Sequence, residues 1–206
     1  MGGTVFRTER APTAEELFSD GPHLATDQFE IGDVNLDKET ATGAELSLRY
    51  RNDRYFLTAN AFYTDYDDYI FEQETGETAI EIDEGTFQFV TDTEDGLPVF
   101  QFVGEDASFK GFEVQGGAKL ARFKGFDIKA DALAEYVRAD SNSGDLPRIP
   151  PFGVLAGIEA DSDAFNLRAE IDYLAEQNKT AEFELPTDSS TPVSYTHLTL
   201  PTTPYV

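Results

Sequence analysis

The amino-acid sequence predicts an all-β fold, an antiparallel transmembrane β-barrel. Three features predict it: residues that alternate between apolar and charged along each strand, aromatic residues at both ends of the apolar faces, and connections that alternate between short and long. Side chains on a strand alternate between its two faces, so the pattern separates one face from the other. Outer-membrane barrels combine these features because one face of each strand meets lipid and the other meets a wet lumen.

The alternation is clearest in the segments 126–136 and 165–173. In the first, one face carries Phe126, Ile128, Ala130, Ala132, Ala134 and Tyr136. The opposite face carries Asp127, Lys129, Asp131, Leu133 and Glu135. In the second, the apolar face carries Phe165, Leu167, Ala169, Ile171 and Tyr173, and the polar face carries Asn166, Arg168, Glu170 and Asp172. Both segments therefore predict strands with lipid on one side and water on the other.

Other segments extend this pattern to about seven strands. They are 39–50, 55–71, 109–120, 126–139, 152–160 and 164–177, with short β-like pieces at 86–90 and 99–103. Within the first, Gly43 predicts a bulge or a kink. Within the second, Tyr55, Leu57 and Tyr63 share the apolar face, while Phe56 and Phe62 interrupt the polarity of the other face.

The connections fall into two classes by length. Short turns are predicted at 51–54, 122–125 and 161–163, and long polar loops at 72–106, 140–148 and 178–192. We expect 86–90 and 99–103 to form a hairpin within the acidic loop 72–106. Outer-membrane barrels have short periplasmic turns and longer extracellular loops. The alternative, a secreted β-sandwich, has no reason to sort its connections in this way, and its strands are usually shorter.

Composition excludes several classes of protein. The 206 residues include 17 Phe and 9 Tyr but no Cys, so disulfides and thiolate metal sites are excluded. The formal net charge of −25 is opposite to what nucleic-acid backbones attract. The longest apolar runs are too short for a transmembrane helix. Residues 1–7 lack the apolar region of a signal peptide, and since a barrel must be exported, we expect the chain to be a fragment.

Two stretches near the N-terminus carry a family resemblance. Arg10-Ala11-Pro12-Thr13-Ala14-Glu15-Glu16-Leu17-Phe18 is one, and Phe29-Glu30-Ile31-Gly32-Asp33 with Leu36 and Glu39 is the other. Together with 96–102, 107–113 and Arg148-Ile149-Pro150-Pro151, they resemble the C-terminal part of the barrel of TonB-dependent outer-membrane receptors, over roughly residues 4–191.

The resemblance implies a location and a function. It implies a bacterial outer-membrane barrel of 22 strands, closed by a plug domain that this chain lacks. It also implies import of a scarce nutrient, such as zinc, haem or a siderophore, energised by the TonB complex acting through the plug. The expected partners are outer-membrane lipid, the TonB complex and a small nutrient or metal substrate. The alternative is a plugless outer-membrane barrel of the porin or adhesin type.

The segment 193–206 departs from the barrel pattern. It runs Val193-Ser194-Tyr195-Thr196-His197-Leu198-Thr199-Leu200-Pro201 and ends at Val206. This string resembles the translation of a transposon-type sequencing adapter, so we expect residues 1–192 to form the partial barrel and 193–206 to be a non-native tail. A genuine disordered tail is the alternative.

The chemistry of enzymes is sparse in this sequence. It contains no Ser/His/Asp grouping, phosphate-binding glycine loop or Cys/His metal spacing, so we expect neither enzymatic activity nor a cofactor. The best binding candidate is His23 with the carboxylates of Asp20, Asp27, Glu30 and Asp33, a set that suits Zn²⁺. The stretch around His23, Gly-Pro-His-Leu-Ala-Thr, resembles receptors implicated in zinc and haem uptake. The alternative is that His23 only packs in an ordered loop, and Ca²⁺ is a second candidate ion for the acidic loops.

The two faces of the strands define two further sets of residues. The predicted lumen-facing set is Arg49, Glu113, Lys119, Asp127, Lys129, Asp131, Arg168, Glu170 and Asp172. The predicted lipid-facing set is Tyr55, Leu57, Tyr63, Phe126, Ile128, Tyr136, Phe165, Leu167, Ile171 and Tyr173. Because the lumen set mixes both charges, we expect it to form ion pairs that hold the wall and contact the plug, rather than to select the substrate.

Overall fold

The described part of the chain forms one sheet of 12 strands. The computed structural model describes residues 1–91, 93, 95–163, 165–192 and 195–199. The long strands are β1 (Gly2–Arg10), β4 (Glu39–Arg51), β5 (Tyr55–Asp83), β7 (Leu97–Phe123), β8 (Phe126–Ser141), β10 (Gly153–Asp161) and β11 (Asn166–Leu174). They are neighbours in this order, and every pair is antiparallel. The predicted antiparallel all-β fold with about seven long strands is therefore confirmed.

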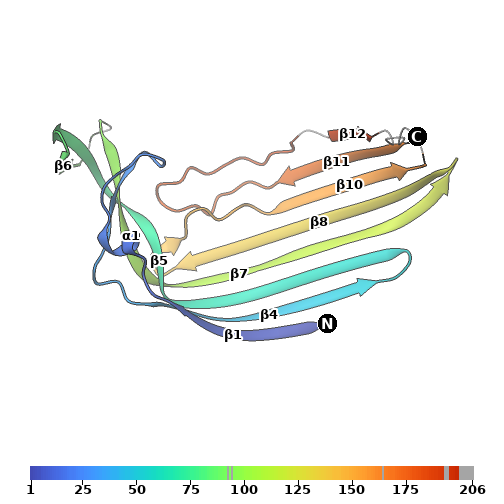
Figure 1. Ribbon diagram of the computed structural model, residues 1–206, viewed down its shortest axis with the longest axis horizontal. Coiled ribbons are helices and arrows are strands. Elements are labelled where there is room, and N and C mark those ends of the chain that lie inside the picture. The colour runs from blue at the N-terminus through green and yellow to red at the C-terminus, as the bar shows by residue number, and fades with distance from the viewer. Residues whose placement is uncertain (92, 94, 164, 193–194, 200–206) are drawn as a thin grey trace, which may run out of the picture.

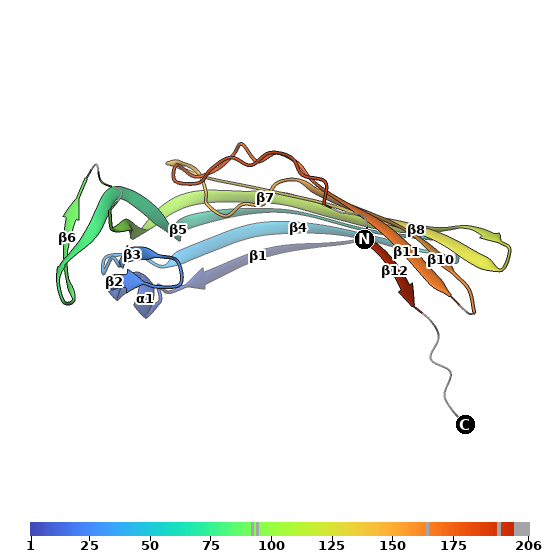
Figure 2. The ribbon, with the colours of Figure 1, turned by 90° about the horizontal axis from the view of Figure 1, so that it is seen from above.

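The long strands lie side by side as a single curved wall (Figures 1 and 2). The short turns gather at one end of the wall, called here the turn end, and the helix and longer connections gather at the other, the loop end (Figure 1). Because every strand among the described residues joins one sheet, the β-sandwich alternative is wrong. In the described part of the chain no helix is long and apolar enough to cross a membrane, a finding that concerns helices alone.

The three predicted short turns are present, and each has a local cause. In the turn 51–54, the side chain of Asn52 accepts hydrogen bonds from the backbone N–H groups of Arg54 and Tyr55, at 2.8 and 2.7 Å. In the turn 122–125, Lys124 and Gly125 both have positive φ, 49° and 89°, as a two-residue hairpin of the I′ type requires. In the third turn, the backbone of Ser162 donates to the carbonyl of Phe165.

The prediction of a loop at 72–106 is wrong for most of these residues, which form strands. β5 continues to Asp83 and β7 begins at Leu97, so one long hairpin extends beyond the wall. The piece 99–103 pairs with β5, and β6 (Thr86–Val90) folds back on β5 at 78–83, so the two pieces do not pair with each other. In the β5 part of this extension, Glu72, Glu74, Glu77 and Glu81 recur without strict alternation, which obscured the strand but leaves the backbone pairing intact.

The N-terminal region contains elements that the sequence pattern did not reveal. Strand β1 pairs with β4 over its whole length. After it come α1 (Ala14–Phe18) and the hairpin of β2 (Asp20–His23) and β3 (Gln28–Ile31), and β3 adds in parallel to β7. The bulge predicted at Gly43 is absent, because β4 and β5 pair without a register shift from Thr40 to Arg51.

The described part of the C-terminal segment adds one short strand. β12 (Tyr195–Thr199) pairs with β11, while residues 193–194 and 200–206 lie outside the described residues. A two-residue strand, β9 (Gly144–Asp145), pairs with the end of β8. The division of the chain into a barrel segment, 1–192, and a non-native tail, 193–206, stays a prediction.

Burial is concentrated at the loop end. One buried cluster joins Phe29, Ala79 and Val99, and a second joins Ala107, Ala139 and Leu146. The wall itself has large apolar side chains in the open, such as Leu46 and Ile158, which are 59% and 51% exposed. A water-soluble sheet would cover such residues with a second layer.

Candidate functional site

The pairing register sorts the wall into two faces. Ile128, Ala160 and Leu167 stand opposite one another across β8, β10 and β11. The adjacent row of the same three strands is Lys129, Glu159 and Arg168. Since neighbouring rows point to opposite sides, the nine predicted lipid-facing residues that belong to strands fall on one side, called here the apolar face, while Phe165 lies in the turn before β11. The nine predicted lumen-facing residues fall on the other, the charged face.

Arg168 is the centre of the best-defined ion cluster on the charged face. Its guanidinium donates to both carboxylate oxygens of Asp131, at 2.7 and 2.9 Å, and to Glu170 at 2.8 Å. Asp131 lies on β8 and Arg168 on β11, so the side chain crosses the intervening strand β10. It does so above Gly157, where a Cβ atom would meet the guanidinium. The cluster therefore ties together three strands.

The other predicted lumen-facing residues differ in their surroundings. Lys129 donates to Glu159 at 2.9 Å and to Asp161 at 3.1 Å. Asp127 lies 3.6 Å from Arg122. In contrast, Glu113 stands opposite Glu135, and Lys119 stands opposite Lys129, so two rows place like charges together. The remaining members of the set, Arg49 and Asp172, share this face and belong to no described ion pair.

Aromatic rings cover the charged face between β1 and β7. Phe56 is the register partner of Gly117, and Phe62 is the partner of Gly111. In each case a Cβ atom on the glycine would collide with the ring, so the ring lies directly over the glycine. Phe6 covers Gly43 in the same way. This packing explains why phenylalanines interrupt a polar face.

The two N-terminal sequence motifs meet at one ion cluster. Arg10 donates to Glu16 at 2.8 Å and to Glu39 at 3.0 Å. Glu16 also closes the capping box of α1 with Thr13. Hydrogen bonds to Glu39 and then Glu16 raise the pKa of Arg10 above its ordinary value. Burial raises the pKa of Glu16, but hydrogen bonds from Arg10 and the Thr13 backbone outweigh it, so this pKa lies below its ordinary value. The cluster fastens α1 to β1 and β4.

Gly32 completes this junction. A Cβ atom at Gly32 would lie 2.6 Å from backbone atoms of Leu17 and Phe18, so only glycine allows this approach to the end of α1. The N–H of Gly32 donates to the carbonyl of Ser19 at 2.7 Å. The hairpin of β2 and β3 is thereby held in place beside the wall at its loop end.

A cavity of about 450 Å³ lies between this hairpin and the wall. His23 Nδ1 lies 2.5 Å from an oxygen of Glu30, whose side chain is 6% exposed. Gln28 donates to Glu30 at 3.3 Å and to Glu72 at 3.0 Å, and Arg148 donates to Glu72 at 3.0 Å. Apolar side chains complete the lining: Tyr69, Ile70, Phe71, Phe102, Ile149 and Phe183. The cavity thus combines one oriented imidazole with aromatic surface.

The rest of the predicted metal set lies elsewhere. Asp20 lines a different cavity, beside Phe87 and Phe89. Asp27 has a φ of 56° in the connection between β2 and β3, and Asp33 accepts from the backbone of Asn35 at 2.8 Å. Among the described residues, no three His, Cys, Asp or Glu side chains are arranged to hold a metal ion. The geometry therefore lends no support to the predicted zinc site or to Ca²⁺ in the acidic region.

Comparison with known proteins places the wall in a family. Residues 3–199 match the family described as TonB-dependent receptor-like β-barrel. The structure is similar to the copper transporter OprC, with a TM-score of 0.64 and 19% identity over 95% of this chain and 27% of that one. It is also similar to the siderophore receptor PirA from Acinetobacter baumannii, with a TM-score of 0.54 and 15% identity over 95% of this chain and 31% of that one. This chain thus spans about a third or less of the length of either protein.

Proposed function

The chain belongs to the TonB-dependent receptor β-barrel family, and from this premise we propose that it forms part of a receptor that imports a metal chelate. Members of this family are outer-membrane proteins of Gram-negative bacteria, and so is this chain. They are receptors and transporters rather than enzymes. The energy for import is proposed to come from the TonB complex, acting through a plug domain inside the barrel.

The two faces of the wall take their roles from this location. We assign the apolar face to lipid and the charged face to the lumen, with the turn end toward the periplasm and the loop end outside the cell. The hydrocarbon of lipid is itself apolar, which accounts for large exposed apolar residues such as Leu46 and Ile158 on the apolar face. The Arg168 cluster then holds the wall from within the lumen and offers charged groups to the plug.

The cavity beside His23 is the proposed contact for the cargo. A metal-binding imidazole usually donates its second ring N–H to a carboxylate, which orients the ring. The pair of His23 and the buried Glu30 has this arrangement and leaves Nε2 of His23 for a ligand. One imidazole alone does not hold a bare ion tightly. A chelate brings its own ligands to the metal, and its organic part suits the aromatic lining of the cavity.

The similar proteins are consistent with this cargo class without specifying it. One is named a copper transporter and the other a siderophore receptor, and both cargoes contain or bind a metal. At 19% and 15% identity the similarity concerns the fold. The single observation that carries the choice of a chelate is the His23–Glu30 pair within a cavity that is partly lined by aromatic side chains.

Calorimetry on the purified receptor that contains this segment tests the cargo. We expect His23→Ala to weaken the binding of haem several-fold and Asp20→Ala, in the neighbouring cavity, to leave it unchanged. Zn²⁺ serves as the bare-ion probe, with little binding expected. Equal haem affinity in the parent and the His23→Ala variant contradicts the assignment, and tight Zn²⁺ binding that requires His23 favours a bare-ion cargo.

Uptake by cells tests the energy source separately. If TonB drives import, collapsing the proton-motive force stops uptake of haem by cells that express the receptor. Uptake that continues unchanged at the same rate indicates a plugless barrel of the porin type instead. Because this assay needs a receptor that binds haem, it is read after the calorimetry: haem binding with uptake that ignores the proton-motive force contradicts the energy source alone.

A further inference from the structure

Two of the three short turns place cations over aromatic rings of the apolar face. The guanidinium carbon of Arg54 lies 5.4 Å from the centre of the Tyr55 ring. In the turn 122–125, Nζ of Lys124 lies 5.3 Å from the centre of the Phe123 ring. Both rings are open to the surroundings, at 46% and 63% exposure. A cation over a ring is held in place yet keeps its charge available.

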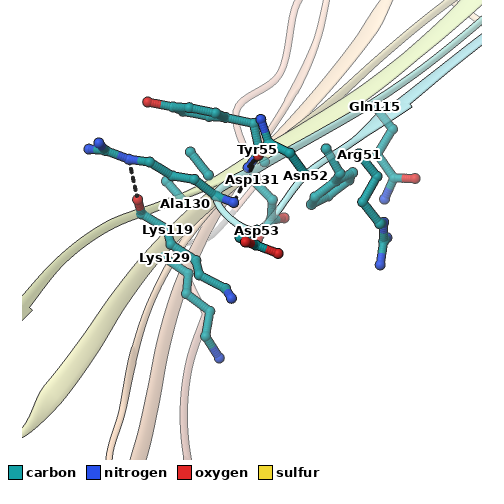
Figure 3. A pocket seen from close by; sticks show the side chains of 13 residues that line it. Arg51, Asn52, Asp53, Tyr55, Gln115, Lys119, Lys129, Ala130 and Asp131 are labelled. Carbon is teal, nitrogen blue, oxygen red and sulfur yellow. Dashed lines mark hydrogen bonds between the residues drawn. The ribbon is translucent and has the colours of Figure 1, made fainter.

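The backbone fixes the position of the first turn against β7. The side chain of Arg54 donates to the carbonyl of Lys119 at 3.2 Å, and the N–H of Lys119 donates to the carbonyl of Arg54 at 2.9 Å (Figure 3). Next to this contact, a register shift between Lys119 and Ala121 inserts Leu120 into β7, where it is 47% exposed. Along β7, Leu120 thus lies between Ala118, the register partner of Tyr55, and Phe123, so the two ring–cation pairs stand several residues apart.

These two turns are rich in Lys and Arg, although the chain as a whole is strongly acidic. The two turns, 51–54 and 122–125, contain four of the chain's 15 Lys and Arg residues, although its net charge is −25. Among the described residues, neither Arg54 nor Lys124 has a carboxylate within ion-pair distance. The third turn has the same exposed aromatic position, Phe165, but it carries Asp161 and Asp163. Positive charge is therefore a property of one sector of the rim and not of every turn.

We propose that these two cation–ring pairs, Arg54 over Tyr55 and Lys124 over Phe123, bind the headgroups of anionic phospholipids in the periplasmic leaflet. Guanidinium and ammonium groups bind phosphate oxygens, and aromatic rings lie at the level of lipid headgroups in barrels. The acidic third turn repels the same headgroup, so the lipid binds to the β5–β8 sector rather than around the whole rim.

Native mass spectrometry of the receptor that contains this segment tests the proposal, with phosphatidylglycerol and phosphatidylcholine as probes. Each basic residue near an anionic lipid surface contributes roughly fivefold in affinity. We therefore expect Arg54→Gln/Lys124→Gln to lower the affinity for phosphatidylglycerol at least tenfold and to leave phosphatidylcholine binding unchanged. A charge-matched control, Arg7→Gln/Lys110→Gln at the loop end, retains phosphatidylglycerol binding.

A gain-of-binding variant keeps the test independent of folding defects in the loss variant. We expect Asp163→Lys, which introduces a cation at the third turn, to add bound phosphatidylglycerol in the otherwise unchanged receptor. Equal affinity of the parent receptor for the two lipids overturns the proposal. So does a correctly folded Arg54→Gln/Lys124→Gln variant that binds phosphatidylglycerol as tightly as the parent.

Discussion

Between β1 and β7 the charged face is covered by aromatic rings over glycines, whereas between β8 and β11 it is covered by ion pairs. The ring of Phe56 lies over its direct register partner, Gly117, and so joins two adjacent strands. The side chain of Arg168 passes over Gly157 and reaches Asp131 two strands away. Glycine has the same steric role in both sectors, because its missing side chain leaves room for a large side chain from a neighbouring strand.

The two sectors differ in what their contacts respond to. Ring–glycine packing depends on shape and dispersion, so salt and pH leave it almost unchanged. Ion pairs that are partly open to water weaken as salt screens them. The side chains of Arg168 and Asp131 are 22% and 31% exposed, so water and ions reach this cluster. One wall therefore contains a salt-insensitive sector and a salt-sensitive one.

Among the changes considered, adding a methyl group under an aromatic ring is expected to lower the free energy of unfolding the most. In Gly117→Ala, the new Cβ meets the Phe56 ring and lies 3.0 Å from the backbone oxygen of Ala130, which cannot move freely. Overpacking of this kind costs about 2–3 kcal/mol of the free energy of unfolding. Urea unfolding of the receptor that contains this segment measures it.

Gly116→Ala is the matched control, one residue away on the opposite face. There the nearest atoms to a new Cβ, at 3.4 and 3.5 Å, make ordinary contacts, so we expect a change within about 0.5 kcal/mol. Phe56→Leu in the Gly117→Ala background should recover part of the loss by reducing the ring. If both glycine variants are equally stable, the ring does not pack as described.

Removing the Arg168 guanidinium from the sector between β8 and β11 is expected to lower the free energy of unfolding by less than Gly117→Ala does. Arg168→Met keeps a long apolar side chain over Gly157 but leaves Asp131 and Glu170 without their donor, which lowers the free energy of unfolding by about 1–2 kcal/mol. The Debye length falls to about 3 Å at 1 M salt, so the difference from the parent should shrink there. A Gly117→Ala difference that shrinks by the same amount would remove the contrast between the sectors.

The smallest expected effect is a pH dependence at the Arg10–Glu16–Glu39 cluster, the ionic contact at the loop end. The pKa of Glu16 is lower in the folded protein than its ordinary value, so this carboxylate stabilises the fold above that ordinary value, about 4.3. The stabilisation is lost as pH falls through the lower, folded pKa. Thermal unfolding midpoints between about pH 6 and pH 3 should fall less in Arg10→Gln than in the parent; parallel curves would contradict this.

The sequence was most informative where two solvents impose two faces. Alternation in segments such as 126–136 predicted the strands, their faces and the three short turns, because lipid and water select opposite side chains at every second position. The same signal failed for β1 and for the extension of β5 beyond residue 71. That extension lies beyond the wall, where both faces meet water, so its residues need not alternate even though the backbone remains paired. In β1, which lies in the wall, Arg7 shares the apolar face with Val5, so the alternation is broken there.

The candidate site was predicted only in part. His23 and Glu30 were predicted and do lie in one cavity, since β2 and β3 pair and place them close together. The sequence carried no signal that Glu72 from β5 and Phe102 from β7 line the same cavity, although Arg148 belongs to the Arg-Ile-Pro-Pro stretch of the family resemblance. Asp20, Asp27 and Asp33 were near His23 in sequence, but each takes another place around the hairpin.

The amino-acid sequence by itself determined the class of fold and the chemistry of each face, because both follow from side-chain polarity at period two. Tertiary structure alone decided which strands Arg168 ties together, which glycines lie under rings, and where the two N-terminal motifs meet. These contacts join residues that are far apart in sequence, such as Arg10 with Glu39 and Asp131 with Arg168. Their partners are set by strand register, and register emerges only when the strands pair.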